Sequence, residues 1–274
     1  MDASSFRYDG KRALVVGGAT GMGAATALLV QDLGAEVVMM DYVPVERPGM
    51  TTIPVDLGNE ASIDAAVDAC GGPIHALFAC AGVADGTPGI EKINFIGHRH
   101  LINRALAADL LPRGAAIGMI SSAAGLAWEA NLDLVKEYLD TPDFDSAVAW
   151  IAAHGKADYM WSKQAMCGYV ARESFAMLQR GIRLNAILPG PTDTPLARAN
   201  ADMWLTFGAD YREVAGIEAS TPEEQAGPLA FLCSDAAAYI NGVTLITDGG
   251  YASAGITSSF PDAKPVIDFL YGRY

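Results

Sequence analysis

The sequence predicts a single α/β domain, a doubly wound parallel sheet of about seven strands with helices on both faces. One observation is an apolar run that leads into a glycine-rich turn and then an Ala/Leu-rich helical pattern, over residues 13–30. Another is the regular alternation of short apolar runs with helical patterns along the rest of the chain. The 274 residues, 51% of them hydrophobic, suffice for one large core.

Residues 13–30 predict a strand, a phosphate-binding loop and a helix. The loop reads Gly17-Gly-Ala-Thr-Gly21-Met-Gly23. Glycines let the backbone turn sharply and approach a ligand closely, and a helix N-terminus offers unpaired N–H groups to a pyrophosphate. Such a loop is a weak signal alone, because a glycine-rich turn often only closes a strand against a helix.

Further strands are expected at 36–40, 52–55, 74–80, 115–120, 182–188 and 242–247. Helices are expected at 61–70, 93–111 and 159–180, and Thr221-Pro-Glu-Glu224 predicts a helix opening with a capping box. Right-handed crossovers bring the carboxyl ends of parallel strands to one edge of the sheet, where a ligand binds. That edge collects Gly17, Asp41, Asp56, Gly82 and Ser122.

Asp41 ends the second expected strand, 24 residues after Gly17. A carboxylate near this offset accepts hydrogen bonds from the adenosine ribose and repels a 2′-phosphate. Neither Tyr42 nor Val43 is basic, so NAD is favoured over NADP. The alternative is that Asp41 merely ends a strand and starts a turn.

The composition excludes several classes of function. A net charge of −14 argues against nucleic acid or an anionic membrane as a partner. No apolar run approaches the roughly 20 residues that span a bilayer, and no signal peptide is apparent, so a cytoplasmic location is expected. His98 and His100 are expected at a surface or interface, with no catalytic metal. The cysteines are expected to be reduced, since none form a C-x-x-C pair; they are Cys70, Cys80, Cys167 and Cys233.

Tyr159 and Lys163 form the chain's Tyr-x-x-x-Lys pair. At i, i+4 on a helix they share one face, and the ammonium should lower the pKa of the phenol toward the range of a general acid or base. Ser122 follows an expected strand, where its hydroxyl can donate to a carbonyl oxygen that gains charge. Asn94 begins a helix beside the same edge.

This order of motifs resembles the classical short-chain dehydrogenase/reductase family, a Rossmann fold, over nearly the whole chain. Val16 stands where the family usually has threonine, and Ala79-Cys80 replaces Asn-Asn before Ala81-Gly82. Gly18-x-x-Gly21-x-x-Ala24 also fits the extended branch of the superfamily, but the chain ends too soon for that branch's larger C-terminal domain. The cofactor residues that follow from the motifs are Gly17, Gly21, Met22, Gly23, Asp41, Asp56, Leu57, Ala81, Gly82, Tyr159, Lys163, Pro189, Gly190, Thr192 and Thr194.

The resemblance implies a catalytic group of Asn94, Ser122, Tyr159 and Lys163. Lys163 would hold the nicotinamide ribose and lower the pKa of Tyr159, which takes the alcohol proton as hydride moves to NAD. Ser122 would fix the substrate oxygen, and Asn94 would hold a water that relays the proton outward. The resemblance also implies a homodimer or homotetramer.

Ser122 and Tyr159 are 37 residues apart, well beyond the dozen or so usual in the family. The resulting insertion, residues 126–158, resembles the bacterial 3α-hydroxysteroid dehydrogenase/carbonyl reductase subgroup, with coniferyl-alcohol dehydrogenases as near neighbours. The apolar faces of the insertion must be buried. A subunit interface and the wall of a bulky substrate's pocket are both open.

Residues 196–220, expected to be irregular, match the family's substrate lid, and the aromatic tail 251–274 shows no clear pattern and would suit burial in a partner subunit. We expect NAD-dependent oxidation or reduction of a secondary alcohol or ketone on a bulky apolar, steroid-like or cyclic scaffold. An aryl or allylic alcohol is the alternative substrate, and a non-catalytic NAD-binding regulatory protein is the alternative class. The expected pocket residues are Ser122, Trp128, Tyr159, Leu196, Met203, Trp204 and Phe207.

Overall fold

The computed structural model describes residues 2–273 and has one parallel sheet in the order β3-β2-β1-β4-β5-β6-β7. This confirms the predicted fold class. Each expected strand is present, with its ends shifted by a residue or a few. The strands are β1 Arg12–Val16, β2 Glu36–Asp41, β3 Met50–Pro54, β4 Ala76–Ala79, β5 Ala116–Ile120, β6 Arg183–Pro189 and β7 Thr244–Thr247.

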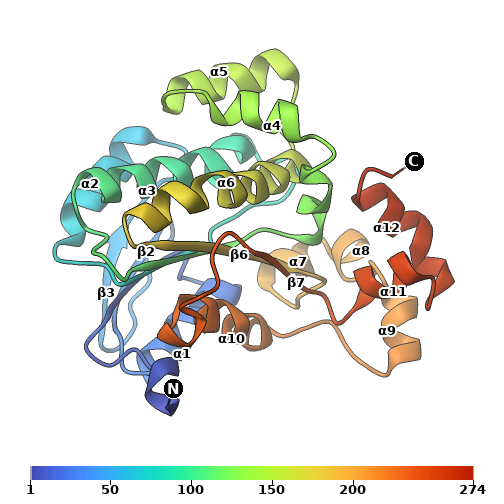
Figure 1. Cartoon of the computed structure of the whole chain (residues 1–274), viewed down its shortest axis with the longest axis horizontal. Coiled ribbons are helices and arrows are strands. Elements are labelled where there is room, and N and C mark those ends of the chain that lie inside the picture. Colours follow the sequence, from blue (N-terminus) through green and yellow to red (C-terminus); the bar gives the residue numbers. More distant parts are fainter. Residues whose placement is uncertain (1, 274) are drawn as a thin grey trace.

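Helices cover both faces of the sheet (Figure 1). On one face lie α2 Glu60–Cys70, α3 Gly97–Ala107 and α6 Tyr159–Gln179, and on the other lie α1 Gly21–Asp32 and α10 Pro222–Cys233. Each face has its own apolar core between sheet and helices. The helix α10 begins with the expected capping box between Thr221 and Glu224. The strand order reverses between β1 and β4, which opens a crevice at their carboxyl ends.

The structure differs from the single helix that was expected at residues 93–111. A π-helical turn, Lys92–Ile96, precedes α3, and the helix ends at Ala107. Such turns are typical of functional sites because they re-aim a side chain, and Asn94 lies on this one. Gly97 permits the close approach that follows, since a Cβ there would lie 2.4 Å from the carbonyl oxygen of Leu57.

The insertion forms η3 Ala123–Trp128, α4 Leu132–Leu139 and α5 Phe144–His154, and α4 and α5 pack on the outer side of α6 (Figure 1). Val135, Tyr138 and Ile151 are fully buried against the chain's own helices. A Cβ at Gly168 of α6 would lie 2.3 Å from Val135, so the glycine allows α4 to approach closely. Much of the apolar face of the insertion is therefore buried within the chain.

The segments after β6 are more ordered than expected. Residues 196–220 contain α7 Pro195–Ala199, α8 Ala201–Trp204 and α9 Ala209–Ala215. The tail is not patternless: it forms α11 Tyr251–Thr257, η5 Pro261–Ala263 and α12 Lys264–Leu270. Ile267 and Leu270 are buried in a core of the same chain, so this part of the tail does not need a partner subunit for burial. Tyr274, part of that expectation, lies outside the described residues.

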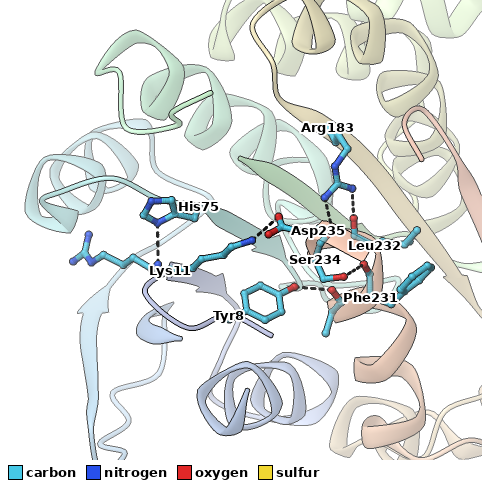
Figure 2. Close-up of polar contacts among 10 residues, drawn as sticks. Tyr8, Lys11, His75, Arg183, Phe231, Leu232, Ser234 and Asp235 are labelled. Carbon is cyan, nitrogen blue, oxygen red and sulfur yellow. Dashed lines mark hydrogen bonds and ion pairs between the residues drawn. The ribbon is translucent and has the colours of Figure 1, made fainter. Parts of the chain in front are cut away.

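Figure 2 shows how the N-terminal segment, which begins with η1 Ala3–Phe6, is tied to the end of α10. The hydroxyl of Tyr8 donates to the carbonyl oxygen of Ala230 at 2.6 Å, and Lys11 pairs with Asp235 of η4 Asp235–Ala237 at 2.6 Å. The guanidinium of Arg183 on β6 donates to the carbonyl oxygens of Leu232 and Ser234. Arg183 thus satisfies carbonyls at the C-terminus of α10, and together with the contacts of Tyr8 and Lys11 it fixes this helix end against the sheet.

Candidate active site

A cleft of about 810 Å³ opens at the carboxyl ends of β1, β2 and β4. Ten of the expected cofactor residues line it, which are Gly17, Gly21, Met22, Gly23, Asp41, Asp56, Leu57, Ala81, Gly82 and Thr194. The structure adds residues that the motifs did not indicate, including Val55, Gly58 and Lys92. The residues that line the cleft extend from the end of β2 to the lid at Leu196.

The glycine loop fits a pyrophosphate. Gly17 has φ +88°, and a Cβ there would lie 2.5 Å from the backbone nitrogen of Ala81; a Cβ on Gly23 would lie 1.9 Å from the carbonyl oxygen of Gly17. Thr20, the N-cap of α1, makes no side-chain capping bond, so the first N–H groups of the helix are left for a ligand. The residues present therefore suit a dinucleotide.

Asp41 is fixed at the end of β2 by two backbone N–H groups. Its Oδ2 accepts from Ala19 at 2.9 Å and its Oδ1 from Val43 at 3.0 Å. Arg47, which sequence reasoning did not consider, donates through Nη2 to the carbonyl oxygen of Ala19 at 3.1 Å. One residue of the glycine loop, Ala19, is thus hydrogen-bonded to a carboxylate through its N–H and to a guanidinium through its carbonyl oxygen.

A second cavity, of about 420 Å³, lies where β5, α6 and the lid meet. It is lined by six of the seven expected pocket residues, namely Ser122, Tyr159, Leu196, Met203, Trp204 and Phe207. The remaining expected cofactor residues lie here as well; they are Lys163, Pro189, Gly190 and Thr192. The two cavities meet, because both are lined by Met22, Cys80, Gly82, Thr194 and Leu196.

The expectation that Trp128 lines the pocket is wrong. It lies at the end of η3 and lines a separate groove with Leu132 and Val135. The helix α12 packs against η3, and its residues Phe269 and Leu270 line the substrate cavity instead. The cavity has no lining residue from 126–158, so the structure gives no support to the insertion as a pocket wall.

Tyr159 is the first residue of α6, and two carboxylates hold that end of the helix. Asp158 accepts from the backbone N–H of Trp161 at 2.7 Å, and Asp85 accepts from that of Tyr159 at 2.6 Å. The side chain of Tyr159 packs on Trp204, with ring centroids 5.0 Å apart. Ser122, which follows β5, lines the same cavity and acts on the pKa of the Tyr159 hydroxyl.

Lys163 lies one turn further along α6 and is 4% exposed. Its Nζ donates to the carbonyl oxygen of Ile120 at 3.0 Å and lies 5.3 Å from the centroid of the Tyr159 ring. Burial lowers the pKa of Lys163 to about 8, because the charged form is poorly solvated there.

The pKa of Tyr159 is raised to about 12, contrary to the expectation from the Tyr-x-x-x-Lys pair. Burial is the largest cause; the Ser122 hydroxyl opposes it and the negative charge of Asp85 adds to it. In this structure the loss of water around the phenol outweighs the i, i+4 spacing. Tyr159 is therefore a phenol at neutral pH.

Asn94 is completely buried. Its Oδ1 accepts from the backbone N–H of Val83 at 2.8 Å, and its Nδ2 donates to the carbonyl oxygen of Val83 at 3.0 Å and to Ser162 at 3.3 Å. These bonds give it a positioning role for the loop after β4 and for the first turn of α6. Its part in a proton relay stays a prediction.

The expectation that His98 lies at a surface or interface is also wrong, because this residue is 1% exposed. Burial lowers its pKa to about 4, so the neutral ring donates through Nε2 to the carbonyl oxygen of Ala81 at 2.9 Å. His98 thereby holds the strand end that faces Gly17. His100 is half-buried and bonded to Asp64 at 2.8 Å. Over residues 2–273 no three metal-binding side chains come together, and no helix there is both long and apolar enough to cross a bilayer.

Comparisons with known proteins agree with this geometry. A family model described as enoyl-(acyl carrier protein) reductase matches residues 143–252. The chain is 29% identical over 258 residues to coniferyl-alcohol dehydrogenase of a Pseudomonas strain, covering 89% of this chain and 97% of that protein. It is 30% identical over 246 residues to 3-alpha-hydroxysteroid dehydrogenase/carbonyl reductase of Comamonas testosteroni, covering 86% and 95%.

Among solved structures, the 3-alpha-hydroxysteroid dehydrogenase of Pseudomonas sp. B-0831, complexed with NADH, superposes with a TM-score of 0.71. The two share 26% identity over 91% of this chain and 99% of that one. This chain has a parallel sheet and a glycine loop, and it resembles these relatives along nearly their full length. These observations lead to one assignment. The chain belongs to the classical short-chain dehydrogenase/reductase family of oxidoreductases.

Proposed function

We propose that the protein is an NAD(H)-dependent dehydrogenase that transfers a hydride between nicotinamide and a secondary alcohol or ketone on a bulky apolar scaffold. The observation that carries the proposal is the junction of the two cavities at Met22, Cys80, Gly82, Thr194 and Leu196. A dinucleotide along the larger cleft would bring its nicotinamide end to this junction. Ser122 and Tyr159 lie on the other side of it, within the smaller cavity.

The chain's own residues supply the proton chemistry. NAD, when bound, supplies a hydride acceptor, and NADH supplies a hydride donor. The hydroxyls of Ser122 and Tyr159, which both line the smaller cavity, form a pair that holds the substrate oxygen. In reduction Tyr159 donates its proton to that oxygen, and in oxidation it accepts the proton. Lys163, beside the Tyr159 ring, stabilises the phenolate and binds the nicotinamide ribose.

The choice of NAD is supported by Asp41. Its carboxylate is held rigidly in the cleft by Ala19 and Val43. A 2′-phosphate on the adenosine ribose would be repelled by this charge, whereas the ribose hydroxyls would donate to it. The bonds of Arg47 to the same loop support a role in holding the loop when NAD is the cofactor.

The substrate class is supported by the lining of the smaller cavity. Met160, Leu196, Met203, Trp204 and Phe207 present apolar and aromatic surface to a ligand. Such a lining suits a ring system better than a sugar or a phosphate ester. Within this class a steroid-like or cyclic alcohol is the first candidate and an aryl or allylic alcohol the second.

The change Tyr159→Phe tests the proposal. We expect it to leave NADH binding within about twofold and to lower kcat for alcohol oxidation by at least about 10³-fold, because the proton acceptor is gone. The matched control is Tyr169→Phe, on the same helix. Tyr169 is buried, and within residues 2–273 its hydroxyl has no hydrogen-bond partner, so kcat should be unchanged. Wild-type turnover by the Tyr159→Phe variant would overturn the proposal.

A further inference from the structure

Asp85 lies at the substrate cavity, although no motif pointed to it. It belongs to the segment between β4 and the π-helical turn, and it lines the cavity together with Tyr159 and Trp204. Its Oδ1 accepts from the backbone N–H of Tyr159 at 2.6 Å, so the carboxylate is held beside the proposed catalytic tyrosine. Within residues 2–273 no hydrogen bond reaches its other oxygen, Oδ2.

The charged side chains around the cavity differ in their exposure to solvent. Of the side chains that line it in the described part of the chain, Asp85 and Lys163 are the two that carry charge at neutral pH. Lys163 is buried and its Nζ donates to Ile120. Asp85 is exposed. An anionic group on a substrate that projects toward Asp85 would meet a carboxylate, with no arginine in the cavity wall to offset it.

We propose that Asp85 is a specificity-determining residue that selects neutral substrates and rejects alcohols or ketones bearing a carboxylate. This inference rests on the proposed function and narrows its substrate class. A substrate hydroxyl or amide can donate to Oδ2, whereas a carboxylate offers no donor and adds a like charge. Because Asp85 is exposed, solvent and salt screen the repulsion, and we expect about fivefold discrimination rather than complete exclusion.

The variant that tests this is Asp85→Asn, which removes the charge but keeps an oxygen to accept from the N–H of Tyr159. The matched control is Asp158→Asn at the same helix end. Asp158 caps α6 by accepting from Trp161, but it does not line the cavity. Both variants remove one negative charge near the start of α6, and asparagine is as good an N-cap as aspartate.

The probes are 4-(1-hydroxyethyl)benzoate and 4-(1-hydroxyethyl)benzamide, which share shape and reacting carbinol and differ in charge. We expect the ratio of kcat/KM for the benzoate over the benzamide to rise about fivefold in Asp85→Asn and to stay constant in Asp158→Asn. For the wild type this ratio should also rise between roughly 0.02 M and 0.5 M NaCl, and for Asp85→Asn it should not. Equal ratios in wild type and Asp85→Asn would overturn the inference.

The outcomes separate this inference from the proposed function. Turnover of neutral alcohols by the wild type, with an unchanged ratio in Asp85→Asn, would leave the function standing and remove the role of Asp85. If the wild type oxidised no alcohol, the proposed function would fail. Dissociation constants of the two probes, measured by calorimetry in the presence of NADH, would then test the selection by charge without turnover. Thermal unfolding would confirm that each variant is folded.

Discussion

The cofactor cleft and the substrate cavity are built in different ways. The cleft is formed mainly at the ends of β1, β2 and β4 and the first turn of α1, where each feature comes from a short stretch of chain. The cavity gathers the end of β5, the start of α6, the lid and α12, and its lining extends from Met22 to Leu270. The expected cofactor site therefore depends on local backbone geometry, whereas the expected substrate pocket depends on how distant segments pack.

The difference also separates rigid from adaptable parts. At Gly17 and Gly23 other backbone atoms lie so close that a Cβ would not fit at either position. The lid residues Met203 and Trp204 instead present side chains to the cavity, and Met203 is largely exposed. Substitutions in the first region should abolish binding, and those in the second should adjust it.

Among substitutions in the cofactor cleft the largest effect is expected for Gly23→Ala. The new Cβ would lie 1.9 Å from the carbonyl oxygen of Gly17, so the loop must move. We expect the Kd for NADH, measured by fluorescence titration, to rise at least about 100-fold. The control is Gly227→Ala on α10, where a Cβ meets no atom within 4 Å. Tight NADH binding by Gly23→Ala would show that the loop is not the phosphate site.

Asp41→Ser should have the next largest effect. Without the carboxylate a 2′-phosphate is no longer repelled, and Arg47, which bonds the same loop residue, Ala19, supplies a cation nearby. We expect the ratio of kcat/KM for NADP over NAD to rise roughly 30-fold, about 2 kcal/mol. The double variant Asp41→Ser/Arg47→Ala should lose most of the gain. A wild type that already prefers NADP would contradict the role given to Asp41.

The pH dependence follows from the raised pKa of Tyr159, about 12. Oxidation needs the phenolate, which is scarce at neutral pH, so kcat/KM for alcohol oxidation should rise by up to about tenfold per pH unit from pH 6 to 8. Reduction needs the phenol, which is already formed, so its rate should be flat over this range. Steady-state profiles in both directions measure this. An oxidation rate independent of pH would rule out Tyr159 as the proton acceptor.

Trp204→Ala should have the smallest effect. Removing its contact with Tyr159 and with the substrate should raise KM for a bulky alcohol about fivefold, with a smaller change in kcat. Trp128→Ala, outside the cavity, is the control and should leave KM unchanged. A larger KM change in Trp128→Ala would restore the insertion as part of the pocket.

Much of the fold could be predicted because its signals are local. Strand positions follow from short apolar runs, and the capping box at Thr221 and Glu224 follows from four residues. Tyr159 and Lys163 were placed by their spacing on one helix, and Ser122 by its position after a strand. The structure brings these three together, and their catalytic roles remain predictions.

The features that were missed depend on tertiary contacts. Trp128 was expected in the pocket, but α12 from the far end of the chain lines the cavity instead. The sequence pattern also could not reveal that His98 points into the core toward Ala81. Arg47 and Asp85 lie in loops without a motif, so only the fold shows that they reach the site.

The central claim is that the two joined cavities form one site of hydride transfer. Its most direct measurement is a panel of steroids, aryl allylic alcohols, terpene alcohols and cyclic ketones with NAD and NADP, run beside an NADH fluorescence titration. We expect NADH binding together with NAD-dependent oxidation of bulky secondary alcohols. Binding of NADH without turnover of any compound in either direction would contradict it and indicate a regulatory NAD-binding protein.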